Sequence, residues 1–260
     1  MQAIVNIALR AGRDAAEILA QNCDRLDRVL VLDDSPGSFV TSAHKDADRS
    51  ILYHLQKSYP QHSFFSRVSG HIAGAEGQPV WLIDALIGGR NFIRGFPAFA
   101  VSIACLVDGK LSHAVLIDPL QDEEYSASRG DGAYVNNRRL RVKSREDLSG
   151  GLIALPGNIA NTSIETYLHF VARMNEMDTS WRTTGCTGLD IVHTAAGRLD
   201  GGWAPNPGKL STAAAALIIQ EAGGLLTDTK GSPDFFDSDF LVFGNPRCLK
   251  QLLKIAASSL

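Results

Sequence analysis

The chain has 260 residues, of which 45% are hydrophobic and 20% are charged, and its formal net charge is -3. This composition is typical of a globular protein, and the length suffices to bury a full core unaided. The charge favours no general attraction to nucleic acid, and the apolar run 96–107 is shorter than the roughly 18 residues of a membrane span. Four scattered cysteines without a Cys-x-x-Cys pair indicate free thiols in a reducing compartment. We therefore expect a cytoplasmic protein without a membrane contact.

Apolar residues at helical spacing predict two helices near the beginning of the chain, over 4–19 and 43–59. Charged residues inside the first helix argue against a signal peptide. The following segments are short and rich in strand-forming residues, and an Asp-Gly turn joins two of them, so we expect mostly antiparallel sheet. The expected strands are 63–65, 80–84, 98–109, 110–119, 123–128 and the basic segment 138–145.

After about residue 150, strands and helices alternate, which predicts a second, α/β half. The expected strands are 152–156, 181–184, 201–203, 225–228 and 240–246, and the expected helices are 164–174, 188–197, 212–224 and 248–259. The predicted division is an N-terminal α+β half, residues 1–150, and a C-terminal α/β half, residues 151–260. No flexible linker separates them, so we expect one compact layered body of the α/β (α+β) class.

Several motifs resemble the inositol monophosphatase family, in its bacterial SuhB-type branch, over nearly the whole chain. They are NIALRAGRDA, FVT, KSYPQHSF, WLID followed by NF, FAVSIACLVDGKLSHAVLIDPLQDEEYSASRGDGAYVNNRRLRV, TGCTGLDIVHTAAGRLDGGW, LIIQEAGGLLTD and GNP. The resemblance implies a five-layer αβαβα sandwich that forms a homodimer. It also implies magnesium-dependent hydrolysis of phosphate monoesters, in which carboxylates hold the metal ions and a metal-bound water attacks phosphorus.

The residues at the family's metal-binding motifs depart from this pattern. The family's Glu-Glu-Ser element aligns with Arg67-Val68-Ser69, so a cation replaces a metal ligand. The Asp-Pro-Leu/Ile-Asp-Gly-Thr signature reads Asp84-Ala85-Leu86-Ile87-Gly88-Gly89, in which the second Asp is Ile87 and the Thr is Gly89. Of this signature's two carboxylates, the first is kept as Asp84.

Three further positions of the family pattern have lost their acidic residue. The Asp of a Trp-Asp pair aligns with Ser211, and the Asp of a Val-Thr-x-x-Asp element aligns with His44. The Glu that contacts substrate hydroxyls aligns with Ala204. Magnesium needs hard oxygen ligands, and the loss of four of five acidic positions (44, 67, 84, 87 and 211) removes most of them. We therefore expect no magnesium cofactor and a catalytically inactive or impaired protein.

The altered pocket has an excess of basic side chains around the remaining acid. We expect Arg67 to pair with Asp84 and to replace a magnesium ion electrostatically. Alternatively, the basin binds a small anion such as phosphate without hydrolysing it. The positions expected to contact such an anion are Arg67, Gly88, Gly89, Arg90 and Ala204, with Lys209 as a further neighbour. Neutral drift after loss of function is a third explanation.

Other candidate sites have simpler interpretations. His44 with Asp84 could form a zinc pair or an acid/base couple, but two ligands fall short of the three that a catalytic zinc normally has. Cys186 precedes a predicted helix whose dipole could stabilise a thiolate, but we favour a small buried residue at a helix start. The segment 130–132 is expected to be a turn, the basic segment 138–145 a solvated strand rather than a nucleic-acid contact, and Trp203 either core or pocket wall.

Three functions remain open from the sequence. The first is a SuhB-like pseudophosphatase that acts through protein contacts, with partners in transcription or ribosome biogenesis implied by the resemblance. The second is a magnesium-dependent phosphatase of inositol 1-phosphate or another sugar phosphate with a rearranged site. The third is a binding module for anionic metabolites that does not hydrolyse them.

Overall fold

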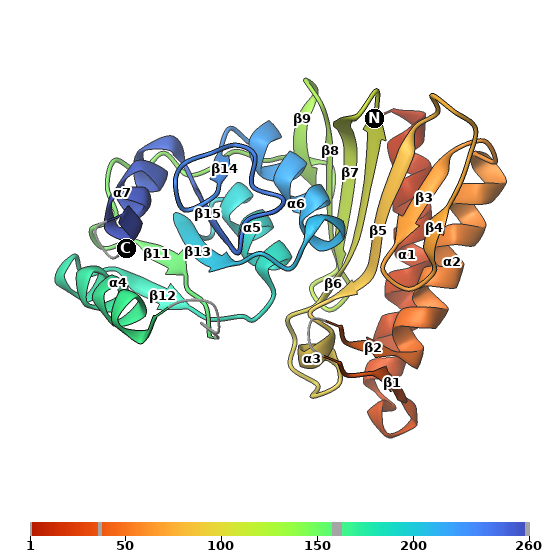
Figure 1. The fold of residues 1–260 in the computed structure, drawn as a ribbon, viewed down its shortest axis with the longest axis horizontal. Coiled ribbons are helices and arrows are strands. Elements are labelled where there is room, and N and C mark those ends of the chain that lie inside the picture. Colours follow the sequence, from red (N-terminus) through yellow and green to blue (C-terminus); the bar gives the residue numbers. More distant parts are fainter. Residues whose placement is uncertain (1, 36–37, 158–162, 258–260) are drawn as a thin grey trace.

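The computed structural model describes residues 2–35, 38–157 and 163–257, and it confirms the predicted five-layer αβαβα sandwich (Figure 1). The layers are α1 with α2, an eight-stranded sheet, α5 with α6, a five-stranded sheet, and α4 with α7. The helices are α1 (Ala3–Cys23), α2 (Ser42–Ser58), α3 (Gly89–Phe92), α4 (Ile164–Glu176), α5 (Thr187–Ala195), α6 (Lys209–Glu221) and α7 (Pro246–Ala257), with a 3₁₀ turn η1 at Leu26–Arg28.

The strands fall into three sheets. A two-stranded ribbon consists of β1 (Val31–Asp33) and β2 (Val40–Thr41). The eight-stranded sheet has the order β10-β9-β8-β7-β6-β5-β3-β4, with β3 (Ser63–Ser66), β4 (Gly70–Ile72), β5 (Val80–Ile87), β6 (Ala100–Val107), β7 (Lys110–Asp118), β8 (Glu123–Ser128), β9 (Gly132–Val135) and β10 (Arg138–Arg139). The five-stranded sheet has the order β12-β11-β13-β15-β14, with β11 (Leu152–Ala154), β12 (Ser180–Arg182), β13 (Gly201–Pro205), β14 (Leu225–Thr227) and β15 (Phe240–Gly244).

The eight-stranded sheet is antiparallel except where β3 runs parallel to β5. Strand β5 is buried from Trp81 to Ile87, as expected for a strand covered by helices on both faces. Its pairing with β6 becomes irregular between Asp84 and Ile87. The end of this buried strand therefore leaves the regular ladder at the point where the polar side chain of Asp84 lies.

Helix α2 begins at a capping box that also shapes the site. The Thr41 side chain accepts a hydrogen bond from the backbone N–H of His44, while the His44 side chain accepts one from the Thr41 N–H. The helix ends at Ser58, just before Tyr59 and Pro60, because a residue that precedes proline disfavours helical backbone.

Helix α6 lies between the two large sheets (Figure 1). Its residues from Ser211 to Ile219 are all buried, and many of them are alanine, which lets the backbone of the helix approach both sheets closely. The helix starts after Gly208, whose φ of 95° favours glycine. The first turn of α6 thus carries Ser211 toward the end of β5.

The structure corrects several expected boundaries. The strand expected over 138–145 is much shorter than predicted, because only Arg138 and Arg139 pair with β9. Beyond them Leu140 N donates to the Ala133 carbonyl and Val142 N to the Ala222 carbonyl, so the chain turns away toward the end of α6. The ribbon β1–β2, the strands β4 and β9, and helix α3 are additional elements.

The predicted last helix, 248–259, begins earlier than expected, at Pro246, and its residues 258–259 lie outside the described part of the chain. The division into halves at residue 150 stays a prediction. Within the described ranges, no helix has both the length and the apolar character required to cross a bilayer.

The tight packing of α6 gives a direct test of this layer. Ala215 is fully buried, so Ala215→Leu inserts a larger side chain between two sheets and should lower the free energy of unfolding by about 2 kcal/mol. The measurement is urea denaturation followed by circular dichroism. Gln220→Leu on the exposed face of the same helix is the control and should change stability by less than about 0.5 kcal/mol. Equal effects of the two variants would contradict the central position of α6.

Candidate functional site

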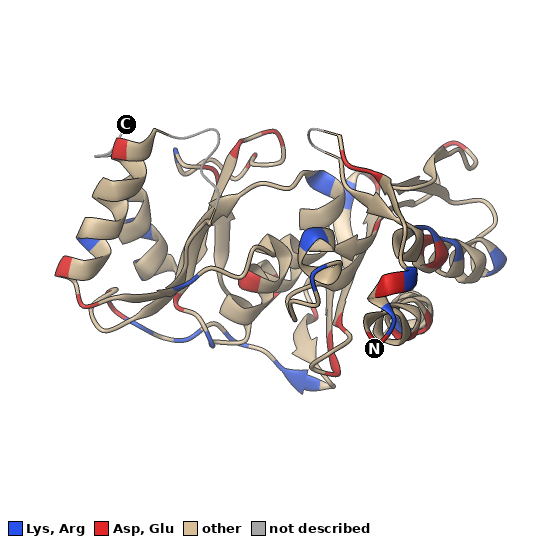
Figure 2. Cartoon of the chain, turned by 90° about the horizontal axis from the view of Figure 1, so that it is seen from below, with Lys and Arg blue, Asp and Glu red and all other residues tan. Residues whose placement is uncertain are grey.

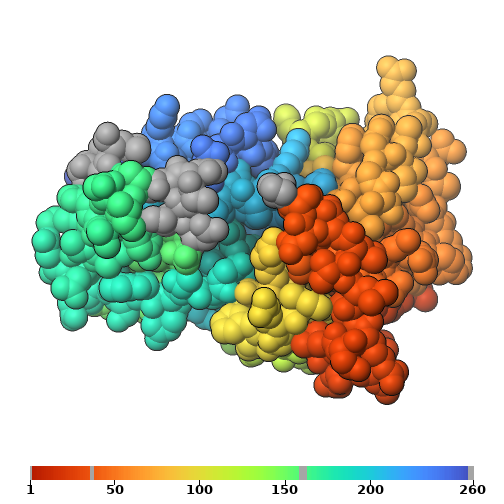
Figure 3. Space-filling model, turned by 60° about the horizontal axis from the view of Figure 1, so that its bottom comes forward, coloured from red at the N-terminus to blue at the C-terminus, as the bar shows by residue number. Residues whose placement is uncertain are grey.

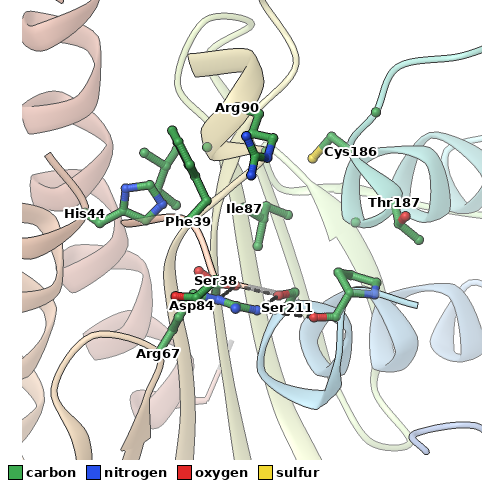
Figure 4. A pocket seen from close by; sticks show the side chains of 16 residues that line it. Ser38, Phe39, His44, Arg67, Asp84, Ile87, Arg90, Cys186, Thr187 and Ser211 are labelled. Carbon is green, nitrogen blue, oxygen red and sulfur yellow. Dashed lines mark hydrogen bonds and ion pairs between the residues drawn. The ribbon is translucent and has the colours of Figure 1, made fainter. Parts of the chain in front are cut away.

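A cavity of about 320 Å³ opens where the end of β5 meets the starts of α2, α3, α5 and α6 (Figure 4). Its lining includes the side chains that the motif alignment singled out. The lining residues are Ser38, Phe39, His44, Arg67, Asp84, Leu86, Ile87, Gly88, Gly89, Arg90, Gly185, Cys186, Thr187, Gly188, Pro207 and Ser211. The five aligned metal-motif positions, which are far apart in the sequence, therefore share one cavity.

Two of the expected basin residues lie elsewhere. Ala204 is buried in β13 within the hydrophobic core and is not among the lining residues. Lys209 places its ammonium group 5.3 Å from the centroid of the Phe236 ring and is also absent from the lining. The basic side chains that line the cavity are Arg67 and Arg90, in addition to His44.

Arg67 and Asp84 form the ion pair that the charge pattern predicted. Arg67 Nε donates to Asp84 Oδ2 at 2.7 Å, and its Nη2 donates to Ser211 Oγ at 2.6 Å and to the Pro207 carbonyl at 3.2 Å. Ser211 Oγ in turn donates to Asp84 Oδ2 at 2.5 Å. Figure 4 shows the guanidinium lying between Asp84 and Ser211. One arginine thus connects the end of β3 with β5 and with the first turn of α6.

The donor set of this cavity does not fit a magnesium ion. Magnesium prefers an octahedral shell of oxygen ligands, usually with one or two carboxylates. Here Asp84 Oδ2 is bound by Arg67 and Ser211, and Asp84 Oδ1 is buried without a hydrogen-bond partner among the described residues. A single free carboxylate oxygen offers too few ligands for the ion. The fixed guanidinium beside it also repels a dication. Within the same residues, no group of three His, Cys, Asp or Glu side chains could hold a metal ion.

Two of the replaced side chains, His44 and Ile87, pack tightly against glycines. A Cβ atom on Gly89 would lie 2.7 Å from His44 Cε1 and 3.1 Å from the Phe39 ring, so the imidazole fills the space where a side chain at position 89 would begin. Ile87 Cδ1 lies 2.4 Å from the Cβ position of Gly188 and fills the neighbouring space in the same way. His44 and Ile87 therefore leave no room for a side chain at positions 89 and 188 of the cavity wall.

His44 is held in its neutral form. Its Nδ1 accepts from Thr41 N at 3.1 Å, which leaves the ring proton on Nε2. Burial is the main cause that lowers the pKa of His44 to about 4, and the nearby Arg67 charge lowers it further, while Asp84 raises it. An imidazole committed in this way to Thr41 is a helix cap and not a free zinc ligand.

Arg90 and Cys186 occupy the upper part of the cavity as drawn in Figure 4. Arg90 lies over the Phe39 ring, 4.8 Å from its centroid, and its Nη2 donates to Asp34 Oδ1 at 2.5 Å. Burial raises the pKa of the Cys186 thiol, so this side chain is an unreactive buried thiol. Phe39 also lines the cavity, a role that its place in the FVT motif did not indicate.

The remaining candidates are structural. Trp203 is buried in a core cluster with its ring 4.9 Å from that of Phe170. Residues 130–132 form a turn whose Gly130 and Gly132 N–H groups donate to the Glu221 carboxylate. Figure 2 shows basic and acidic segments spread over the fold, and Arg145 of the basic segment lies beside Asp200.

A sequence model of the inositol monophosphatase family matches residues 1–259. The Nus factor SuhB of Pseudomonas aeruginosa is 41% identical over 258 residues, and that of Escherichia coli K12 is 36% identical over 254 residues; each alignment covers 97% of this chain and 95% of the relative. The crystal structure of the extragenic suppressor protein suhB from Bartonella henselae is similar with a TM-score of 0.94 and 32% identity over the full length of both chains. An inositol monophosphatase from Anabaena gives a TM-score of 0.84 at 25% identity, covering 99% of this chain and 96% of that one.

The buried ion pair predicts a large effect of removing its cation. Arg67→Met leaves the Asp84 carboxylate buried without a counter-charge and should lower the free energy of unfolding by about 3 kcal/mol. Adding Asp84→Asn should recover most of this loss. Arg49→Met, which breaks an exposed pair with Asp46, is the control and should cost less than about 1 kcal/mol in urea denaturation. If Arg67→Met were as mild as the control, the ion pair would not support the site.

The neutral His44 predicts a specific dependence of stability on pH. Because its folded pKa, about 4, lies below the ordinary 6.5, the unfolded chain binds more protons between these values, and stability falls as the pH decreases through this window. The contribution lost between pH 7 and pH 5 should be about 2 kcal/mol. The measurement is urea denaturation at both pH values for the wild type and for His44→Gln, which keeps an acceptor for the helix cap. An equal pH dependence in both proteins would show that His44 is not the group responsible.

Proposed function

The chain belongs to the inositol monophosphatase family and to its SuhB-type branch, and we propose that it is a member without magnesium-dependent phosphatase activity. It acts in the cytoplasm, as a homodimer, through contacts with protein partners in transcription. The observation that carries this proposal is the guanidinium of Arg67, bound to Asp84 and Ser211 at the centre of the cavity.

The chemistry of the family requires what this cavity lacks. Hydrolysis by metal-bound water depends on carboxylates that hold the metal ions and neutralise their charge. In this chain the corresponding positions carry a cation, an aliphatic side chain, a hydroxyl and a helix-capping imidazole, at Arg67, Ile87, Ser211 and His44. His44 fits closely against Gly89 and Ile87 against Gly188, which supports a cavity wall that is packed by these side chains. No step of the family reaction is therefore assigned to these residues.

The relatives support the second part of the proposal. The proteins from Pseudomonas aeruginosa and Escherichia coli are both named Nus factor SuhB, and they align with this chain over almost its whole length. A role that depends on protein contacts needs the folded surface and not the metal site. Such a role can persist when the cavity no longer holds magnesium.

Binding of a small anion is a second candidate. Among the ionised side chains that line the cavity, Arg67 and Arg90 are cationic and Asp84 is anionic, so the lining keeps one excess positive charge. Arg90 also pairs with Asp34, which reduces the attraction. Calorimetric titration with inositol 1-phosphate and with inorganic phosphate, without magnesium, measures this binding, and Arg90→Gln should weaken it.

Phosphate release from inositol 1-phosphate tests the main proposal. The wild type should release no phosphate above background with or without magnesium, because the metal ligands are missing. A variant with Arg67→Glu, Ile87→Asp and Ser211→Asp restores three carboxylates and should gain magnesium-dependent release. A second variant adds His44→Asp with Gly89→Thr, since a side chain at position 89 fits only after the imidazole is removed.

The controls distinguish phosphate release by this site from phosphate release by a contaminating phosphatase. Asp84→Asn is introduced into the wild type and into the restored variants. It removes the one carboxylate that the wild type keeps at the five aligned metal-motif positions. Magnesium-dependent turnover by the wild type that disappears in Asp84→Asn would overturn the proposal. Circular dichroism of each variant checks that the fold is intact.

A further inference from the structure

A second cavity, of about 410 Å³, lies between the start of α1 and the strands β8 and β9. It is larger than the first cavity at the end of β5, which has about 320 Å³. Cavities of this volume bind small molecules. Most of the lining side chains are polar, and the lining residues are Gln2, Val5, Ser126, Ala127, Ser128, Asp131, Tyr134 and Asn137.

The two cavities lie at opposite ends of the eight-stranded sheet. In Figure 1 the start of α1 lies at the upper end of this sheet, whereas α3 and the ribbon β1–β2, which lie next to the first cavity, are at its lower end. Figure 3 brings this lower end forward and shows the ribbon, in red, beside the segment of α3, in yellow. The two linings have no residue in common, so a ligand in the second cavity would not contact the aligned metal positions.

The pleat of β8 directs two serine side chains toward the second cavity. Tyr125 and Ala127 belong to the core cluster on the side of α5 and α6. Ser126 and Ser128 alternate with them, so these side chains face the layer of α1. Tyr134 of β9 is the antiparallel partner of Ser126 and lies on the same face. Three hydroxyl groups from two neighbouring strands therefore face the start of α1.

The polar groups of this face keep free hydrogen-bonding capacity. Ser126 is 4% exposed, yet its hydroxyl forms no hydrogen bond with another residue that the structure describes. A buried hydroxyl requires a partner, and the open side of Ser126 is the cavity. Ser128 Oγ lies 3.1 Å from His113 Nδ1. Asp131 accepts from Gln2 Nε2 at 2.9 Å through Oδ2, which leaves Oδ1 as an acceptor.

The charges around the second cavity favour a neutral ligand. Asp131 is the one charged side chain among the lining residues that the structure describes, and it repels a phosphate group. Its partner Gln2 is the N-cap of α1, so the positive end of the helix dipole opposes a cationic ligand there. Burial lowers the pKa of the nearby His113, although Asp131 raises it, so this ring is neutral at pH 7.

We propose that the second cavity binds a neutral polyol, a sugar or a cyclitol, through the hydroxyls of Ser126 and Ser128 and the carboxylate of Asp131. Each hydroxyl group of such a ligand both donates and accepts hydrogen bonds. It therefore matches the serine hydroxyls, and it donates to the free oxygen of Asp131. The half-buried ring of Tyr134 adds apolar surface beside these groups. The inference goes beyond the proposed function and does not depend on it, since the first cavity contributes none of these residues.

Nuclear magnetic resonance of the full chain, with labelled valine and isoleucine methyl groups, tests this inference. The probes are D-glucose, D-mannitol and myo-inositol at millimolar concentrations, with inorganic phosphate as the charged comparison. At least one polyol should cause saturable shifts of the Val5 methyl signals, because Val5 lines the second cavity. The same polyol should leave the signal of Ile87 in the first cavity unchanged, and phosphate should leave Val5 unchanged.

Removal of single polar groups should weaken binding of the polyol that shifts Val5. Ser126→Ala and Asp131→Asn should each raise its Kd about tenfold, because each variant loses a hydrogen bond to a ligand hydroxyl. Ser112→Ala is the matched control, since Ser112 lies on the neighbouring strand β7 but does not line the cavity, and its Kd should equal that of the wild type. The methyl spectrum of each variant checks that the fold is intact.

Three results would overturn the inference. They are a lack of saturable shifts at Val5 with all the polyols, shifts centred on Ile87 instead, and an unchanged Kd in Ser126→Ala and Asp131→Asn. The mapping on the wild type does not depend on the folding of any variant. None of these results would alter the phosphate-release assay, so failure of this inference and failure of the proposed function can be told apart.

Discussion

The ion pair between Arg67 and Asp84 is the interaction on which the site depends. Asp84 lies at the buried end of β5, where an ionised carboxylate without a counter-charge would be strongly destabilising. Arg67 provides this charge from the end of β3 and also bonds Ser211 and the Pro207 carbonyl at the start of α6. The same side chain thus neutralises the strand end and links the eight-stranded sheet to the helix between the two sheets.

The proposed loss of magnesium binding would separate the fold of the family from its chemistry. The sandwich depends on buried apolar layers, which remain complete around β5 and α6. The family's hydrolytic function depends on a few carboxylates, and among the aligned positions 44, 67, 84, 87 and 211 this chain has a carboxylate at Asp84 alone. Arg67 pairs with Asp84, and His44 fills the space beside Gly89. Overall similarity and local chemistry therefore support different conclusions about activity.

Much of the fold could be predicted from periodicity and motifs, and the pairing of Arg67 with Asp84 followed from a charge reversal beside the one retained acid. Local sequence patterns gave a wrong strand length where hydrogen bonds between distant segments determine the path of the backbone. Leu140 and Val142 alternate with basic residues as in a strand. However, the backbone N–H of Leu140 donates to the Ala133 carbonyl and that of Val142 to the Ala222 carbonyl. The ribbon β1–β2 is too short for a periodic signal. Alignment also gave Ala204 a pocket position, although its side chain packs into the core, because motif spacing does not fix orientation.

The central claim is that the guanidinium of Arg67 takes the place of a magnesium ion beside Asp84. Isothermal titration calorimetry with magnesium chloride measures this most directly, on the wild type and on the variant with Arg67→Glu, Ile87→Asp and Ser211→Asp. We expect no saturable binding to the wild type at millimolar magnesium and measurable binding to the variant. Saturable binding to the wild type that Asp84→Asn abolishes would contradict the proposed role of Arg67.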